Sequence, residues 1–219
     1  NMTDQWAKIE LMNSRRQAAL TAVNSSSFTS IAHTVRFLLR DCMTYGTVPF
    51  AVMARYSFIA SVFLDSLKSR NVIEPHDYDL MMSMLPTVAS GIGEDLQKVD
   101  DEVISKEHFL EKYGHLRPGT YEITSSNYME DAATYISTQS QENRRDYSLK
   151  SSHEFRTFLG KYERQIASLI SESGFSFNVD DFILFVSKTI PAREKLKFEF
   201  TKNINAVLTM LVEFGELLD

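Results

Sequence analysis

The chain of 219 residues is long enough to bury a hydrophobic core, and its 43% of hydrophobic residues argues against a disordered protein. Its net charge of −6 argues against a broad nucleic-acid surface, because phosphate binding needs a clustered excess of Lys and Arg. The single cysteine, Cys42, cannot form an internal disulfide and fits a reducing compartment. The first residues lack the basic and apolar regions of a signal peptide, and no run approaches 18 apolar residues. We therefore expect a cytoplasmic protein that binds neither nucleic acid nor membrane.

Helical spacing of apolar residues dominates the N-terminal third of the chain. The first predicted helix begins near Trp6 and ends before the polar run at residues 24–27. The apolar stripe of the second predicted helix consists of Ile31, Val35, Leu38, Leu39 and Cys42. We expect Gly46 and Pro49 to end that helix. A third helix then runs from about Pro49 to Arg70, because proline is tolerated in the first turn of a helix.

The middle of the chain is expected to contain shorter helices and one loop. Pro75 signals a helix start and Pro86 a break, after which a helix is expected over about residues 88–103. A short helix follows over residues 105–113, because the serine at its start is a good N-cap. From residue 114 to about residue 127 the helical pattern disappears, and we expect an ordered loop rich in turn residues.

Three further helices are predicted in the C-terminal third. The apolar spacing favours one helix over about residues 155–170, which Gly174 closes. Another runs over about residues 180–190 and leads to Pro191. The last runs over about residues 196–211, nearly to the end of the chain.

Together these elements predict an all-α fold, because strand signals are negligible. We expect an irregular multi-helix bundle with one long ordered loop near residues 114–127, forming a single helical domain over residues 1–219. None of the five histidines sits in a zinc-binding pattern, and the Walker A, GxGxxG, GxSxG and HExxH motifs do not occur. The sequence therefore predicts no metal site and no complete active site.

Three stretches of the chain resemble segments of a known family and occur in the same order as in that family. Residues 109–123 read FLEKYGHLRPGTYEI, similar to the YGHRGPGE-type segment of the phosphoenolpyruvate synthase and pyruvate phosphate dikinase-like phosphotransferases. Residues 49–60 read PFAVMARYSFIA and resemble the helix that precedes that segment in the family. Residues 193–202 read REKLKFEFTK and resemble the RE..KF helix that follows it. The resemblance spans roughly residues 28–215 and places the chain in the central helical region of such a transferase.

Family members couple an ATP-grasp nucleotide domain to a swivelling domain whose histidine carries the phosphoryl group, with a helical region between them. The present sequence has neither the ATP-grasp signatures nor the Gly-rich Thr-Ser-His-Ala context of the phosphohistidine. The resemblance therefore implies a segment excised from a larger kinase-type protein and inactive alone. Its partners would be the ATP-grasp and swivelling phosphohistidine domains of the same protein and a small anionic acceptor. ATP and magnesium are expected as cofactors of the intact enzyme only.

His115 and Arg117 are the candidate ligand contacts in the loop. The segment departs from the family pattern at Leu116, where Arg is common, and at Arg117, where Gly is frequent, so the arginine is displaced by one position. A guanidinium presents a planar fork that suits phosphate or carboxylate, which favours an anionic site. The alternative is that both side chains tie the loop to neighbouring helices, since polar groups of ordered loops commonly satisfy buried backbone.

Four other charged residues are candidates for acceptor or phosphate binding. Arg193 and Lys197 are four residues apart and share a helix face beside Glu194. That face fits an acceptor or an acidic edge of a partner domain, and equally a solvated surface with a local ion pair. Arg55 lies in an apolar helix, where a charge normally needs a partner, so we expect it to pair with a carboxylate such as Glu194.

Two classes of function remain open on the sequence alone. The first is an acceptor-binding or linker domain of a phosphoenolpyruvate synthase-like phosphotransferase, in which this body positions groups for transfer. The second is a stand-alone helical module that binds another protein and has no enzymatic activity. A basic hollow near His115, Arg117 and Arg193 favours the first, whereas a large exposed apolar patch favours the second.

Overall fold

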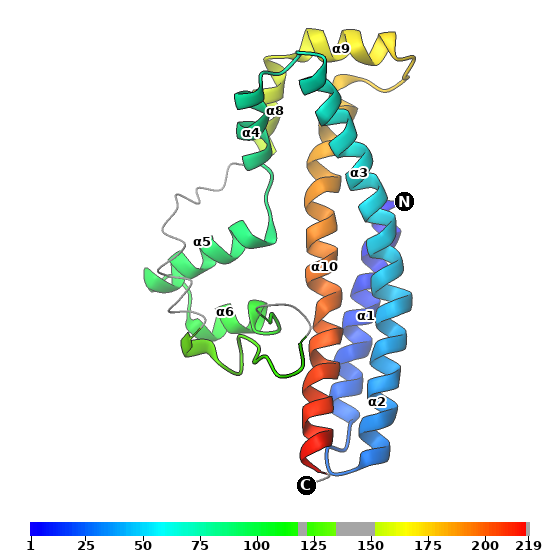
Figure 1. The fold of residues 1–219 in the computed structure, drawn as a ribbon, viewed down its shortest axis with the longest axis vertical. Coiled ribbons are helices and arrows are strands. Elements are labelled where there is room, and N and C mark those ends of the chain that lie inside the picture. Colours follow the sequence, from blue (N-terminus) through cyan, green and yellow to red (C-terminus); the bar gives the residue numbers. More distant parts are fainter. Residues whose placement is uncertain (118–121, 135–151, 218–219) are drawn as a thin grey trace. The chain divides into compact units, whose positions relative to one another are not determined.

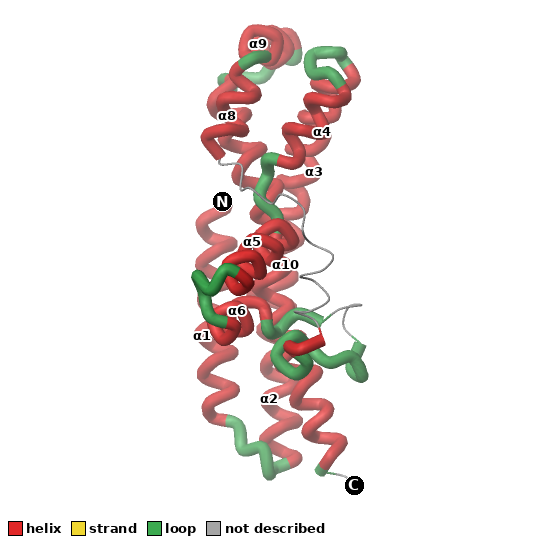
Figure 2. Tube along the Cα trace, turned by 90° about the vertical axis from the view of Figure 1, so that its left-hand side faces the viewer, coloured by secondary structure: helices red, strands yellow, loops and turns green. Residues whose placement is uncertain are grey.

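A computed structural model describes residues 1–117, 122–134 and 152–217, and within these ranges it contains helices and loops but no strand (Figure 2). The prediction of an all-α fold is confirmed. The elements are α1 (Met2–Ala22), α2 (Phe28–Asp41), the π-helical turn η1 (Cys42–Thr47), α3 (Val48–Ser69), α4 (Pro75–Ser83), α5 (Val88–Asp100), α6 (Lys106–Tyr113), α8 (Ser152–Gly160), α9 (Glu163–Glu172) and α10 (Val179–Glu216).

The chain divides into two compact units, and helices α3, α5 and α10 contribute residues to both. Unit 1 comprises Asn1–Ala51, Gly91–Tyr147 and Leu196–Asp219. Unit 2 comprises Val52–Ser90 and Ser148–Lys195. Each unit has its own buried apolar clusters.

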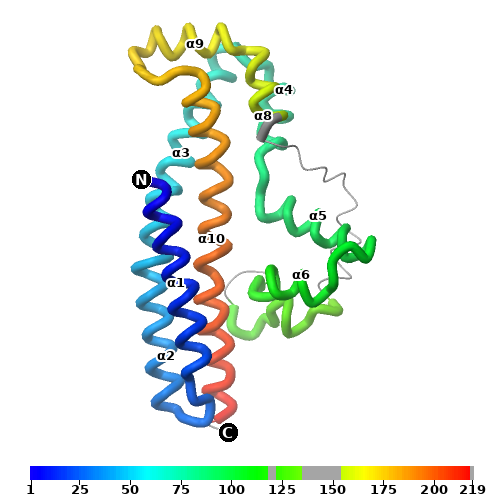
Figure 3. The backbone as a smooth tube through the Cα atoms, turned by 180° about the vertical axis from the view of Figure 1, so that it is seen from behind, coloured from blue at the N-terminus to red at the C-terminus, as the bar shows by residue number. Residues whose placement is uncertain are grey.

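In unit 1, α1, α2 and the C-terminal part of α10 lie side by side (Figures 1 and 3). The buried residues that join α2 to α10 are Ile31, Val35, Leu38, Val207 and Met210. A second cluster joins α5, α6 and the loop after α6, and its buried residues are Leu96, Phe109, Tyr113 and Tyr128. Cys42 is buried, as its apolar surroundings in the sequence predicted.

The predicted end of a helix at Gly46 to Pro49 is wrong. Helix continues from Phe28 to Ser69, and η1 widens one turn so that the Val48 N–H donates to the Met43 carbonyl, five residues back. A π-type turn of this kind changes the hydrogen-bond register ahead of a proline, whose missing N–H is then tolerated. Among the described residues, this one helix is long and apolar enough to cross a bilayer, a criterion that core helices of soluble proteins also meet.

Two further helix boundaries differ from the prediction. Pro191 lies inside the 38-residue helix α10, because buried residues on either side of it, Val186 and Leu196, hold the helix by packing. The single helix predicted over residues 155–170 is two helices, α8 and α9, separated by a turn after Gly160. Their apolar residues follow one helical spacing because both helices pack on the same core.

Unit 2 is built around one cluster from α3, α4, α8, α9 and the start of α10. The cluster includes Leu64, Met81, Phe155, Leu159, Ile166 and Val186. Helix α4 lies beside α8 (Figure 1), and the Tyr162 hydroxyl donates to Asp77. The methionines of α4 fill this core: Met81 is fully buried and Met82 packs against the cluster.

Candidate functional site

The segment after α6 folds back against α10 within unit 1. Gly114 caps α6, and only glycine fits there, because a Cβ would lie 2.4 Å from the Leu110 carbonyl oxygen. Two backbone bonds close the loop: the Tyr128 N–H donates to the Leu116 carbonyl over 2.9 Å, and the Met129 N–H to the Gly114 carbonyl over 3.0 Å. Residues 118–121 of the predicted loop lie outside the described residues.

His115 is held on α10 by its ring. Its Nε2 lies 3.1 Å from the Phe198 carbonyl oxygen, to which it donates, and its ring meets the Phe198 ring edge-on at 4.6 Å. Burial lowers the pKa of His115 to about 4, and the nearby Lys202 ammonium acts in the same direction. The imidazole is therefore neutral at pH 7 and contributes no positive charge to an anion site.

Every nitrogen of the Arg117 guanidinium donates a hydrogen bond to another group of the protein. Its side chain is only 4% exposed. Nε donates to Asn205 over 2.9 Å, Nη1 donates to the Ser125 carbonyl, and Nη2 donates to Thr209 over 3.3 Å. Glu130 lies 3.6 Å from Nη2 and supplies the counter-charge. These contacts fit the predicted role of tying the loop to neighbouring helices.

The other predicted candidates are divided between the two units. Arg55, Arg193 and Glu194 belong to unit 2, whereas Lys197 belongs to unit 1 and is exposed. Arg193 pairs with Glu194 at 3.7 Å, and its guanidinium lies 5.3 Å from the Phe58 ring centroid. The predicted pairing of Arg55 with Glu194 is wrong, because Arg55 lies on the exposed face of α3, where water solvates its charge.

Two adjacent arginines of α1 were missed by the sequence reasoning. Arg15 makes a bidentate ion pair with buried Asp41, over 2.5 Å from Nε and 3.0 Å from Nη2. Arg16 donates from Nη1 to Asn13 over 2.7 Å and to Asn203 over 3.0 Å. Burial lowers the pKa of Arg16, and the attraction of the nearby Glu199 carboxylate offsets only part of this effect; no carboxylate of the described residues forms an ion pair with Arg16.

Arg16 is part of a polar network between α1 and α10. Asn203 is fully buried and its Nδ2 donates to the Leu38 carbonyl over 3.2 Å. Glu199 accepts from Asn13 and from Lys202, each over 2.9 Å. Burial raises the pKa of Glu199, but the hydrogen bonds from Lys202 and Asn13 outweigh it, so the carboxylate has a pKa below its usual value. The one signal in the sequence for this network was Asn203, a polar residue that falls on the apolar stripe of α10.

A hollow of about 600 Å³ opens beside these groups and His115 in unit 1. Its charged lining residues are Arg16, Lys202, Glu111, Glu130 and Glu213. The apolar ones are Leu20, Val23, Leu110, Met129, Ala206 and Met210. Arg117 is not among the lining residues, so the hollow is of mixed charge and differs from the basic hollow around His115, Arg117 and Arg193 that would favour an acceptor site.

A second polar cluster of unit 1 is centred on the Asp95 carboxylate. Asp95 accepts from Lys98 over 2.7 Å, from Lys112 over 2.6 Å and from the Tyr113 hydroxyl over 3.0 Å. Burial raises the pKa of Asp95, but these three bonds outweigh it and lower the pKa to about 2. Because each partner comes from α5 or α6, the cluster joins these two helices.

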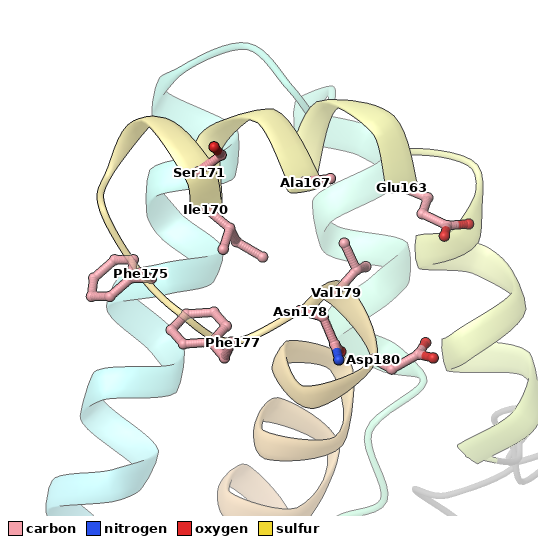
Figure 4. A pocket seen from close by; sticks show the side chains of 9 residues that line it. All are labelled: Glu163, Ala167, Ile170, Ser171, Phe175, Phe177, Asn178, Val179 and Asp180. Carbon is pink, nitrogen blue, oxygen red and sulfur yellow. The ribbon is translucent and has the colours of Figure 1, made fainter.

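Unit 2 has a smaller hollow of about 330 Å³ under α9 (Figure 4). Phe175 and Phe177 stack at 5.0 Å at one end of it, and Glu163 and Asp180 lie at the other. Asp180 is paired with Arg156 at 2.8 Å. None of the residues predicted as site residues lines this hollow.

Comparisons of the chain with models of protein families, with curated proteins and with solved structures found no match.

Proposed function

We propose that this chain is the central helical domain of a phosphoenolpyruvate synthase-like phosphotransferase, and that it acts as a linker that is inactive alone. One observation supports the proposal most. The three stretches that resemble the family meet around one turn of α10: His115 bonds to the Phe198 carbonyl, and the Phe50 ring lies 5.4 Å from the Phe200 ring. Segments separated by about 80 to 150 positions in the sequence thus form a single packed site.

The contacts of Arg117 favour the linker role over direct acceptor binding by this side chain. Three of the five N–H groups of this guanidinium already donate to protein acceptors, Glu130 lies 3.6 Å away, and the side chain is only 4% exposed, so phosphate has no access to it. In the intact enzyme, ATP with magnesium would phosphorylate a histidine of the swivelling domain, which then delivers the phosphoryl group to a small anionic acceptor. The present chain would supply the helical connection between the two moving parts.

The test is to read the coding sequence on both sides of the segment. The proposal expects an ATP-grasp region upstream and a Gly-rich Thr-Ser-His element downstream, in one reading frame. Stop codons at both ends would refute it and leave an autonomous helical body.

A stand-alone interaction module is the second candidate, and one observation favours it. Helix α3 exposes large apolar side chains on one face, with Phe58 58%, Ile59 46% and Val62 64% exposed. An exposed apolar stripe on a helix is typical of a surface that packs against another body. Replacing Val62 by Lys should then abolish co-purification of a specific partner from the source cells. Replacing the exposed Arg36 by Lys should leave the co-purification unchanged.

A further inference from the structure

We propose that the hollow of unit 1 binds a small carboxylate with an apolar body, and that Arg16 takes the carboxylate through the Nε and Nη2 edge of its guanidinium. The hollow is the space of about 600 Å³ lined by α1, α6, the following loop and α10. This inference goes beyond the proposed function, because it holds whether or not the chain belongs to a phosphotransferase.

The guanidinium of Arg16 has an unused edge. Both of its hydrogen bonds to protein leave from Nη1, to Asn13 and Asn203, and no acceptor of the described residues bonds to Nε or Nη2. Arg15 shows what this edge does in the same helix, since its Nε and Nη2 grip Asp41 in a bidentate pair. A planar fork of two parallel N–H groups matches the two oxygens of a carboxylate.

Arg16 also lacks a direct carboxylate partner among the described residues, although the Glu199 carboxylate attracts it from beyond ion-pair distance. Its two acceptors are neutral amides, whereas a desolvated cation normally has a carboxylate partner. The other cation of the hollow, Lys202, is paired with Glu199 at 2.9 Å. Burial lowers the pKa of Arg16 and the attraction of Glu199 offsets only part of that effect, so a carboxylate on the Nε and Nη2 edge would stabilise the cation further.

The carboxylates that line the hollow do not satisfy Arg16. Glu130 lies 3.6 Å from Arg117, and Glu111 is 77% exposed and 4.0 Å from His108. Neither these nor Glu213 forms an ion pair with Arg16 in the described part of the chain. Water screens the exposed Glu111, so the ligand carboxylate would interact mainly with the half-buried guanidinium.

The remainder of the lining sets the class of ligand. Leu20, Val23, Met129 and Met210 offer apolar surface beside the polar groups, and a volume of about 600 Å³ is in the range of small-molecule sites. A ligand with one carboxylate and an apolar body satisfies both parts, whereas inorganic phosphate would leave the apolar lining uncovered. Neutral His115 adds no charge to the hollow.

The test is to titrate the 219-residue protein with benzoate and, separately, with its neutral isostere benzamide, by calorimetry and ligand-observed NMR. We expect benzoate to bind with a Kd on the order of 1 mM and benzamide at least about tenfold more weakly. Arg16→Met should weaken benzoate binding at least about tenfold. Arg16→Lys, which keeps the charge but loses the fork, should weaken it severalfold. Arg36→Met, at an exposed arginine of α2, should leave it unchanged.

Several results would overturn the assignment. These are equal binding of benzoate and benzamide, equal binding by wild type and Arg16→Met, an equal loss in Arg36→Met, or no benzoate binding to wild type at roughly 20 mM. Circular dichroism melts establish that each variant is folded, and Arg16→Lys serves the test if Arg16→Met is not. The coding sequence that tests the phosphotransferase proposal has no bearing on these titrations, so the two proposals fail separately.

Discussion

Arg15 and Arg16 are neighbours in α1, yet the structure gives them opposite surroundings. Arg15 holds a buried carboxylate, Asp41, and its guanidinium also lies 4.8 Å from the Phe37 ring centroid. Arg16 donates hydrogen bonds to the amides of Asn13 and Asn203, forms no ion pair within the described residues, and lines a hollow. Adjacent residues of a helix point about 100° apart, so consecutive arginines can serve different neighbours. The same type of side chain therefore fastens α1 to α2 at one position and, at the next, keeps two guanidinium nitrogens without an acceptor among the described residues.

The largest expected effect on stability comes from removing the Arg15 guanidinium. Arg15→Met leaves Asp41, a 4% exposed residue, without its cation, and should lower the free energy of unfolding by about 4 kcal/mol. Urea unfolding followed by circular dichroism measures the change. The double variant Arg15→Met with Asp41→Leu should recover most of the loss, because it removes the orphaned charge as well. A loss below about 1 kcal/mol in the single variant would show that the pair is solvated.

The next largest expected effect is a pH dependence of stability caused by His115, which lines the same hollow as Arg16. Burial lowers the pKa of His115 to about 4 from its ordinary 6.5, so the unfolded chain binds the proton more readily than the folded one. Stability is therefore full above pH 6.5 and is lost as the pH falls toward 4, by about 3 kcal/mol in total. Urea midpoints measured between pH 7.5 and 4.5 give the slope.

The control for this pH dependence is His115→Gln, which keeps a hydrogen-bond donor but does not titrate. Its slope over the same window should be much flatter than that of the wild type. The depressed pKa of Asp95, about 2, affects stability only at lower pH and does not interfere above pH 4.5. Identical slopes in both proteins would contradict the burial of a neutral His115.

A smaller effect tests the close approach of η1 and α10, which sets the position of the network around Arg16. A Cβ on Gly46 would lie 2.7 Å from the Phe200 Cβ and 3.1 Å from the Met12 sulfur. Gly46→Ala should therefore cost about 2 kcal/mol in thermal or urea unfolding. Gly215→Ala is the matched control, because nothing lies within 4 Å of a Cβ there. That change should be neutral or stabilising by up to about 1 kcal/mol, since alanine favours helix over glycine.

The smallest expected effect is that of Arg16→Met on stability. Arg16→Met leaves the buried Asn203 amide oxygen without its donor, but it also removes the desolvation cost of a cation that forms no ion pair, so the free energy of unfolding should fall by only about 1 kcal/mol. Urea unfolding beside Arg15→Met makes the contrast direct. A loss as large as that of Arg15→Met would mean that Arg16 is structural and would remove the distinction between the two arginines.

The sequence predicted the helices better than their ends. The N-cap at Ser105 is confirmed, with its hydroxyl accepting from the His108 N–H over 3.1 Å, because capping depends on a few adjacent residues. The breaks at Pro49 and Pro191 were wrong, because packing of neighbouring residues keeps both prolines within helix. Such packing joins distant segments and is invisible to local periodicity.

The same limit applies to the candidate site. His115 and Arg117 were singled out correctly as polar groups of the loop, but their partners on α10 lie 83 to 92 positions further along the chain. Arg16 gave no local signal, since its significance depends on which of its nitrogens the fold leaves unbonded. Pairing of that kind requires the tertiary structure.

The most direct test of the proposed function is phosphorylation of the polypeptide encoded by the complete reading frame. The intact product would be incubated with radiolabelled ATP and magnesium, next to the 219-residue segment alone. The account predicts an acid-labile phosphohistidine in the intact product outside residues 1–219, and no label in the isolated segment. An intact product that remains unlabelled under conditions where it is folded would contradict the assignment to a phosphotransferase.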